Sequence, residues 1–96
     1  MLPKDQKLRT IIEEERFRLE LQAIVAHASD ADDFVVGVKW ALARSPEIGR
    51  CIGKGPVWFL PMAIRLNLLP IVLYYTFDEE TVNLLSIIET VYPPQE

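Results

Sequence analysis

The sequence predicts an α+β domain in which two helices precede a block of antiparallel strands. Apolar residues recur at helical spacing over residues 16–44. β-Branched and aromatic residues are concentrated over 57–63 and 71–88, and a polar turn divides the second of these stretches. Because the helices come first and the strands follow as a block, we expect the helices to lie on one face of the sheet.

Length and composition are those of one folded domain spanning residues 1–96. Half of the residues are hydrophobic and a quarter are charged, which excludes a disordered chain. No apolar run approaches the roughly 18 residues that would span a membrane, and the N-terminal residues lack the apolar stretch of a signal peptide. We therefore expect a cytoplasmic protein with no membrane partner, and flexible ends at 1–7 and 91–96.

Metal-binding and disulfide chemistry have little support in the sequence. Cys51 is the single cysteine and His27 the single histidine. They cannot form an internal disulfide or a structural zinc site between them. No cofactor or metal is expected, and His27 is interpreted as a capping or surface residue at the end of a helix.

The first helix is expected from Arg16 to about His27. One apolar stripe runs along it, formed by Phe17, Leu21, Ile24, Val25 and Ala28. The preceding stretch, Leu8 to Glu13, is compatible with a first strand or with the leading turns of the helix, and periodicity does not decide between them.

The second helix is expected to begin at Ser29 or Asp30, whose side chains can cap it, and to end near Arg44 before Pro46. Asp32 and Asp33 would lie in its first turn, at the positive end of the helix dipole. The stripe that should face the sheet consists of Phe34, Val35, Val38, Ala41 and Leu42.

A second apolar stripe, Val36, Trp40 and Ala43, lies on another side of the same helix. Burial beneath a neighbouring loop or tail is the favoured interpretation. The alternative is a contact surface for a partner protein. On this second interpretation the partner-binding residues are Val36 and Trp40, together with Trp58.

The strand block begins after a glycine-rich loop over residues 45–56. Val57 to Ala63 is expected as a strand that lies at an edge or carries a bulge at Pro61, because proline cannot donate to a ladder. Ile71 to Phe77 and Val82 to Ile88 are expected to form a hairpin around the turn Asp78 to Thr81. Both alternate sets of the first hairpin strand are largely apolar, so this strand should be central and covered on both faces.

The chain resembles the RelE/ParE superfamily of bacterial toxins. Three stretches carry the resemblance: RTIIEEERF, LARSPEIGRCIGKGPVWFLP with Pro46 and Gly49, and PIVLYYTFDEETVNLLSIIE with Tyr74 and Tyr75. The resemblance implies a small sheet with two helices, preceded by a strand and ending in a three-stranded antiparallel meander. It also implies a growth-inhibiting toxin of a type II toxin-antitoxin system, of the kind that serves plasmid stabilization, neutralised by a cognate antitoxin protein that wraps the sheet and helices.

Two branches of the family differ in chemistry. The RelE-like branch cleaves messenger RNA at the ribosome, which needs a base, an acid and cations around the reacting phosphate. The arginine expected before the third strand is replaced here by Ile71, and the remaining candidates are Arg50, Lys54, Arg65 and Tyr92. The ParE-like branch binds DNA gyrase without a chemical step of its own.

A ParE-like mode of action is therefore favoured, and enzymatic activity is left open. The net charge of −4 and a basic face of only Arg50, Lys54 and Arg65 argue against tight RNA binding and against direct sequence-specific DNA binding by this chain. The alternatives are a ribosome-dependent endoribonuclease and a non-toxic interaction module with the same fold.

Overall fold

The computed structural model describes residues 8–64 and 69–90. The elements follow in the order β1 (Thr10–Glu13), α1 (Glu15–Val25), α2 (Asp30–Arg44), the 3-10 turn η1 (Pro46–Ile48), β2 (Arg50–Cys51), β3 (Trp58–Ile64), β4 (Leu69–Phe77) and β5 (Thr81–Glu89). Leu8 to Glu13 thus contains a strand, which resolves the ambiguity of the sequence. The ends expected to be flexible, 1–7 and 91–96, lie outside the described residues.

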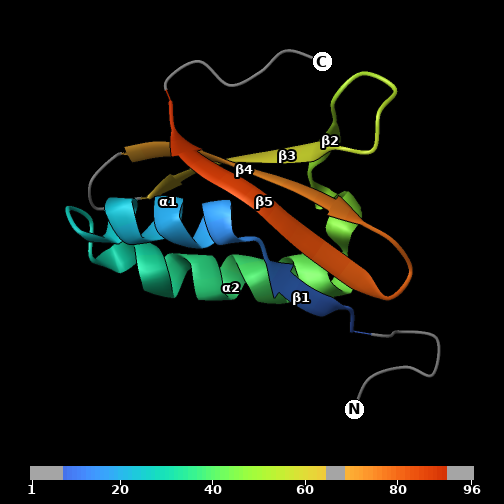
Figure 1. The fold of residues 1–96 in the computed structure, drawn as a ribbon, viewed down its shortest axis with the longest axis horizontal. Coiled ribbons are helices and arrows are strands. Elements are labelled where there is room, and N and C mark those ends of the chain that lie inside the picture. Colours follow the sequence, from blue (N-terminus) through green and yellow to red (C-terminus); the bar gives the residue numbers. More distant parts are fainter. Residues whose placement is uncertain (1–7, 65–68, 91–96) are drawn as a thin grey trace.

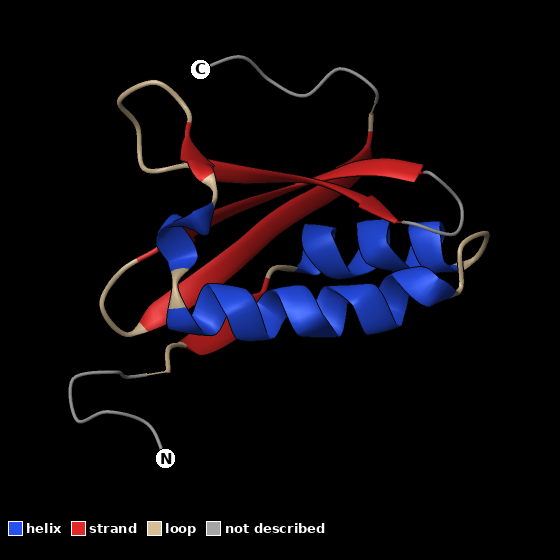
Figure 2. Ribbon diagram, turned by 180° about the vertical axis from the view of Figure 1, so that it is seen from behind, coloured by secondary structure: helices blue, strands red, loops and turns tan. Residues whose placement is uncertain are grey.

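One mixed sheet of five strands, in the order β1-β5-β4-β3-β2, organises the described part of the chain. β1 runs parallel to β5, and the other neighbouring strands are antiparallel. Figures 1 and 2 show α1 and α2 side by side beneath one face of this sheet. The expected α+β class is confirmed.

β4 is the middle strand of the sheet, as its sequence predicts. Ile71, Val72 and Leu73 are consecutive, so they point alternately to opposite faces, and each is at most 1% exposed. Both faces of β4 are therefore covered at this point. The hairpin between β4 and β5 is also confirmed.

Asp78 holds the hairpin turn together. Its Oδ1 accepts hydrogen bonds from the backbone N–H groups of Glu80 and Thr81, each at 2.8 Å, and from the Thr81 hydroxyl at 3.1 Å. These backbone donors lower the pKa of Asp78, because they favour its ionised form. The carboxylate thus makes a local turn that fixes where β5 begins.

β5 contains a bulge at Leu85. Tyr75 pairs with Leu84 and Tyr74 with Ser86, so Leu85 is the extra residue. The bulge shifts the alternation of side chains. As a result Val82, Leu84 and Ile87 are all buried in the same core.

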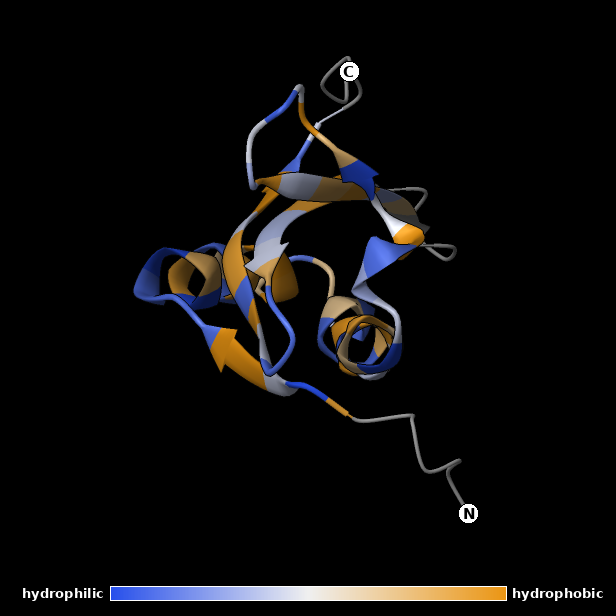
Figure 3. Ribbon diagram, turned by 90° about the vertical axis from the view of Figure 1, so that its right-hand side faces the viewer, coloured by the Kyte–Doolittle hydropathy of each residue, from blue (hydrophilic) through white to orange (hydrophobic). Residues whose placement is uncertain are grey.

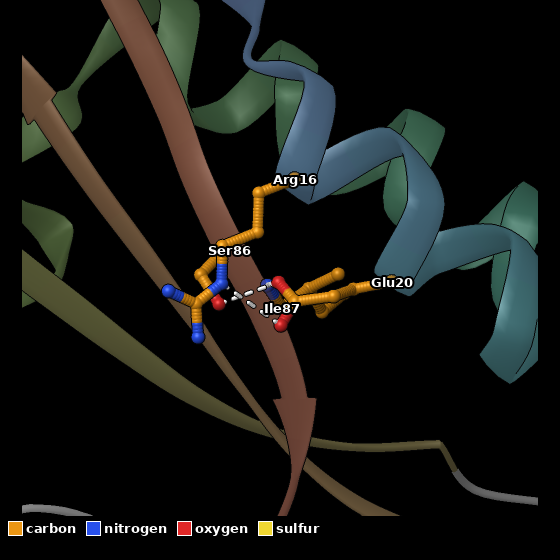
Figure 4. A network of polar contacts seen from close by, with 4 residues as sticks. All are labelled: Arg16, Glu20, Ser86 and Ile87. Atoms are coloured by element: carbon orange, nitrogen blue, oxygen red, sulfur yellow. Dashed lines mark hydrogen bonds and ion pairs between the residues drawn. The ribbon is translucent and has the colours of Figure 1, made fainter.

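Glu20 of α1 satisfies the polar groups at this bulge, as Figure 4 shows. Its Oε1 accepts a hydrogen bond from the Ser86 hydroxyl at 2.6 Å and one from the Ile87 N–H at 3.1 Å. Its Oε2 lies 3.2 Å from Nε of Arg16, one helical turn earlier. A carboxylate in the middle of α1 therefore ties the helix to the irregular part of β5.

The helices bury most of the predicted apolar positions. The α1 stripe is confirmed, since Phe17, Leu21, Ile24 and Ala28 are buried. On α2 the buried residues are Ala31, Val35, Leu42 and Ala43, and Val38 packs against the core. Phe34 was wrongly placed in the sheet-facing stripe: its side chain is 37% exposed, because the buried face is centred on the Ala31, Val35 and Leu42 side of the helix.

The beginning of α2 also differs from the prediction. Ser29 precedes the helix, but neither it nor Asp30 makes a side-chain cap. The backbone of Ser29 is already helical, with φ −60° and ψ −24°, whereas a capping serine is extended. The N–H of Ala31 instead bonds to the carbonyl of Ala28 at 2.9 Å.

The stretch predicted as loop, residues 45–56, includes η1 and the short strand β2. β2 pairs only with Trp58 and Phe59 at the start of β3. Beyond that point β3 has β4 on one side and an open edge on the other, and Pro61 is exposed there. The edge position expected for Pro61 is thus confirmed, because its missing N–H falls where no strand needs it.

Candidate protein-binding site

A shallow apolar groove lies between residues 8–11, which include the start of β1, and α2. Its volume is about 270 Å³ and it is lined by Leu8, Arg9, Ile11, Val36, Lys39, Trp40 and Ala43. We call it the β1–α2 groove. Figure 3 shows β1 as a mostly orange, hydrophobic arrow at the lower edge of the sheet.

Two contacts hold the walls of this groove together. The N–H of Arg9 donates to the carbonyl of Ala43 at 3.0 Å, near the end of α2. Further along, the ammonium of Lys39 forms an ion pair with the carboxylate of Glu13. β1 alternates, so Ile11 and Glu13 are half-buried while Thr10 and Ile12 are exposed. The two walls of the groove are therefore joined by direct contacts.

Trp40 and Val36 are the most exposed apolar side chains of the groove, at 60% and 48%. The favoured burial of this stripe beneath a loop or tail is therefore wrong for both residues and correct only for Ala43, which is 5% exposed. α2 turns only its opposite side and the edge at Ala43 toward the sheet. An exposed tryptophan beside other apolar residues is typical of a binding surface.

Arg9, which the sequence analysis did not single out, anchors the groove to the hairpin. Its Nε donates to the carbonyl of Asp78 at 2.6 Å, and its guanidinium lies 5.8 Å from the centre of the Phe77 ring. Leu8, Arg9, Ile11 and Lys39 could not be assigned to a site from the sequence. Lys39 belongs to α2 itself, and the pairing of β1 with β5 together with the Arg9–Ala43 hydrogen bond brings Leu8, Arg9 and Ile11 beside it.

A second groove, of about 460 Å³, runs between α1 and α2. It is lined by Glu13, Arg18, Leu21, Gln22, Val25, Ala26, Asp32 and Lys39. Lys39 lines both grooves, and its ion-pair partner Glu13 lines this second one, so the Glu13–Lys39 pair lies where the two grooves approach each other. Five of its eight lining residues are polar or charged, which makes it the less suitable surface for an apolar partner.

Trp58, the third predicted partner-binding residue, lies elsewhere. Its half-buried ring packs edge-on against Phe77 with 5.2 Å between ring centres, and it borders the core. It does not line the β1–α2 groove. The structure therefore brings Trp40 and Val36 together and separates Trp58 from them.

Two of the four predicted catalytic candidates lie in the part of the chain that the structure describes. Arg50 is exposed on β2, in register with Phe59, and Lys54 is exposed in the turn between β2 and β3. Arg65 and Tyr92 lie outside the described residues. Within residues 8–64 and 69–90, no group of three or more histidine, cysteine, aspartate or glutamate side chains could hold a metal ion.

Ile71, the position at which an RNA-cutting relative is expected to carry arginine, is 1% exposed and lies in the core. The Ile71 side chain is therefore enclosed in the core and is not presented at the surface. The isoleucine is thus explained by packing, and its presence says less about chemistry than the sequence alone suggested.

Tyr75 has a structural role. Its buried hydroxyl donates to the carbonyl of Pro46 and accepts a hydrogen bond from the N–H of Gly49 at 3.1 Å. Burial raises the pKa of Tyr75 to about 12, because the charged phenolate is disfavoured away from water. This hydroxyl joins β4 to η1 and is not available to a substrate.

Among the described residues, no helix is long and apolar enough to cross a membrane. The sequence matches no protein-family model, and no curated protein is significantly similar to it.

Proposed function

We propose that this chain is the toxin component of a bacterial type II toxin-antitoxin system. In this proposal a cognate antitoxin protein neutralises it by binding the β1–α2 groove. The toxin acts in the cytoplasm by binding its own target, in the ParE-like manner, with DNA gyrase as the first candidate. The observation that carries the proposal is the exposed Trp40 side chain on an apolar groove whose walls are joined by the Arg9–Ala43 and Glu13–Lys39 contacts.

The arrangement of elements supports the family. A strand, two helices and three successive strands paired antiparallel follow in the order that the resemblance to RelE/ParE toxins implies. β2 is an addition to that order, but it contributes only two residues at the edge of the sheet.

The surroundings of the described candidates support action by binding. Cleavage of RNA requires a base, an acid and cations close to one phosphate. Arg50 and Lys54 lie on a strand and in a turn at the edge of the sheet, and the buried hydroxyl of Tyr75 is engaged by Pro46 and Gly49. The RelE-type alternative would therefore need Arg65 and Tyr92 to complete its site.

Induced expression in a bacterial host is the first test. We expect growth to stop, and co-expression of the adjacent small reading frame to restore it. Normal growth without an antitoxin would refute the toxin and leave a non-toxic interaction module. The presence of a small partner gene directly beside this one is a cheap preliminary observation.

A second measurement separates the two modes of action. After induction, DNA breaks linked to gyrase are compared with cleavage of messenger RNA on ribosomes. We expect the first and not the second. Prompt ribosome-dependent cleavage would instead identify an endoribonuclease.

A further inference from the structure

We propose that the β1–α2 groove receives an extended segment of the partner, which adds as a sixth strand to the free edge of β1. The segment carries apolar side chains at alternate positions and acidic side chains between them. This inference rests on the proposed function, which supplies the partner, but its geometry comes from the edge of the sheet.

Within residues 8–64 and 69–90, the backbone of β1 has hydrogen-bonding groups that no other strand pairs. β1 is the terminal strand of the sheet, and the N–H groups of Thr10 and Glu14 bond to the carbonyls of Glu80 and Leu84. In a parallel ladder, alternate residues direct both their N–H and C=O groups to the same neighbour. Ile11 and Glu13 therefore direct theirs away from β5, toward the open edge.

This open edge runs beside the exposed side of α2. Arg9, two positions before Ile11, directs its N–H the same way and reaches the Ala43 carbonyl of α2. Beyond that contact, Ile11 and Glu13 have no backbone partner at this edge within residues 8–64 and 69–90. A strand added here would satisfy these groups and at the same time cover Trp40 and Val36.

An extended occupant fits these features better than a helix. A helix uses its backbone groups internally, so it would cover Trp40 but leave the edge of β1 unpaired. In a strand, every second side chain points to the same face, so alternate apolar residues would all face α2. Apolar side chains on that face would contact Leu8, Val36 and Trp40, which are 38%, 48% and 60% exposed.

Charge complementarity favours an acidic segment. The two charged residues that line the groove, Arg9 and Lys39, are both cationic, and Lys39 is paired with the carboxylate of Glu13. An occupant with carboxylates beside its apolar residues would meet the guanidinium of Arg9, although the chain as a whole carries −4. A second copy of this chain is the competing occupant, and a peptide-free dimer would reveal it.

The test uses the full chain, labelled with ¹⁵N, and a nine-residue peptide of alternating glutamate and valine. At saturation we expect hydrogen exchange at the Ile11 and Glu13 amides to slow at least tenfold and the Trp40 indole signal to shift. A peptide with lysine for glutamate, and one with the same composition in two blocks, should bind at least tenfold more weakly.

Two variants at one position provide a matched control. Glu13→Pro removes the outward N–H while sparing the ladder to β5, and Glu13→Ala removes the same carboxylate but keeps the N–H. We expect the proline variant to lose peptide binding and the alanine variant to retain it. Thermal unfolding shows whether each variant is folded. If the proline variant is not folded, protection of the Ile11 and Glu13 amides in the unchanged chain decides whether the peptide adds as a strand.

Several outcomes would overturn the proposal. The first is that the alternating peptide does not bind. The second is that the peptide shifts the Trp40 indole signal but leaves hydrogen exchange at the Ile11 and Glu13 amides unchanged. The third is that the chain forms a dimer without peptide in which the same amides are protected. Growth arrest is scored separately. A toxic chain that fails the peptide test refutes the added strand alone, and a chain that passes it without arresting growth refutes the toxin alone.

Discussion

Tyr75 shows at the scale of a single residue how one polar atom connects two elements. Its ring is part of the core, and its hydroxyl bonds to both Pro46 and Gly49. The sequence could indicate that one of two adjacent tyrosines is buried. It could not identify the partners of the hydroxyl, because they lie 29 and 26 positions away.

We expect Tyr75→Phe to lower the free energy of unfolding by about 1–3 kcal/mol at neutral pH, because a buried carbonyl and N–H lose their partner. Urea unfolding followed by circular dichroism measures this. Tyr74→Phe, at the half-buried neighbour, is the control and should have a smaller effect.

The same hydroxyl predicts a loss of stability in alkali. The pKa is about 12 in the folded chain, against an ordinary value of about 10 in the unfolded chain. The protonated hydroxyl therefore contributes fully to the free energy of unfolding below about pH 10. As the pH rises from 10 to 12 this contribution is lost, by at most about 3 kcal/mol. The Tyr75→Phe variant should lack this component. If the unchanged protein and the Tyr75→Phe variant lost the same free energy of unfolding between pH 10 and 12, the raised pKa could not be assigned to Tyr75.

Gly49 is required for its small size. Its φ of −83° suits any residue, but a Cβ atom there would lie 2.3 Å from the Tyr75 hydroxyl oxygen and 2.6 Å from the Phe59 carbonyl oxygen. We expect Gly49→Ala to destabilise the fold by about 1–3 kcal/mol in a thermal or urea unfolding measurement.

Gly37→Ala is the matched control, because nothing lies within 4 Å of a Cβ at this helical position. It should stabilise the chain by about 0.5–1 kcal/mol. Equal effects of the two substitutions would contradict the steric role of Gly49.

The bulge in β5 operates at the scale of an element. Its sequence, VNLLSII, does carry a signal, since Val82 and Leu84 alternate but the next core residue is Ile87. The identity of Glu20 as the group that satisfies the bulge could not be read from the sequence, because it depends on how α1 packs against β5.

We expect Glu20→Ala to cost about 1–3 kcal/mol of stability, since the Ile87 N–H would lose its acceptor in a partly buried place. Glu20→Gln keeps an oxygen acceptor and should cost less. Chemical denaturation of the two variants, together with amide exchange at Ile87, tests this. A glutamine variant as unstable as the alanine variant would show that the charge is what matters.

Elements with strong periodicity could be predicted from the sequence, and those fixed by tertiary contacts could not. The β4–β5 hairpin and both helices have enough residues for their spacing to be decisive. β2 has two residues, and β1 has four whose state depends on pairing with β5, so neither is defined by its own sequence.

At the scale of the whole molecule, the exposure of Trp40 is the feature that the sequence left open. The apolar stripe was visible, but its exposure depends on where the rest of the chain runs. Trp58 illustrates the converse, because a tryptophan predicted to bind a partner is packed on Phe77 instead.

We expect Trp40→Ala to weaken binding of the antitoxin at least tenfold and to change the thermal unfolding temperature little, because the side chain is largely exposed in the free protein. Leu19→Ala is the control: Leu19 on α1 is 58% exposed and lies outside the β1–α2 groove. Calorimetric titration measures both. Equal weakening by the two substitutions would remove the groove from the binding surface.

The parallel pairing of β1 with β5 has a consequence for when the protein becomes functional during its synthesis. Arg9 and its partner Asp78 are 69 positions apart, so a ribosome adding roughly 5–20 residues per second needs several seconds to join them. Until β5 emerges, β1 has no neighbouring strand and the β1–α2 groove does not exist. The surface proposed to bind the antitoxin is thus absent from the nascent chain and arises together with the completed sheet. Binding of any partner at this groove must therefore wait until nearly all of the described chain has been made.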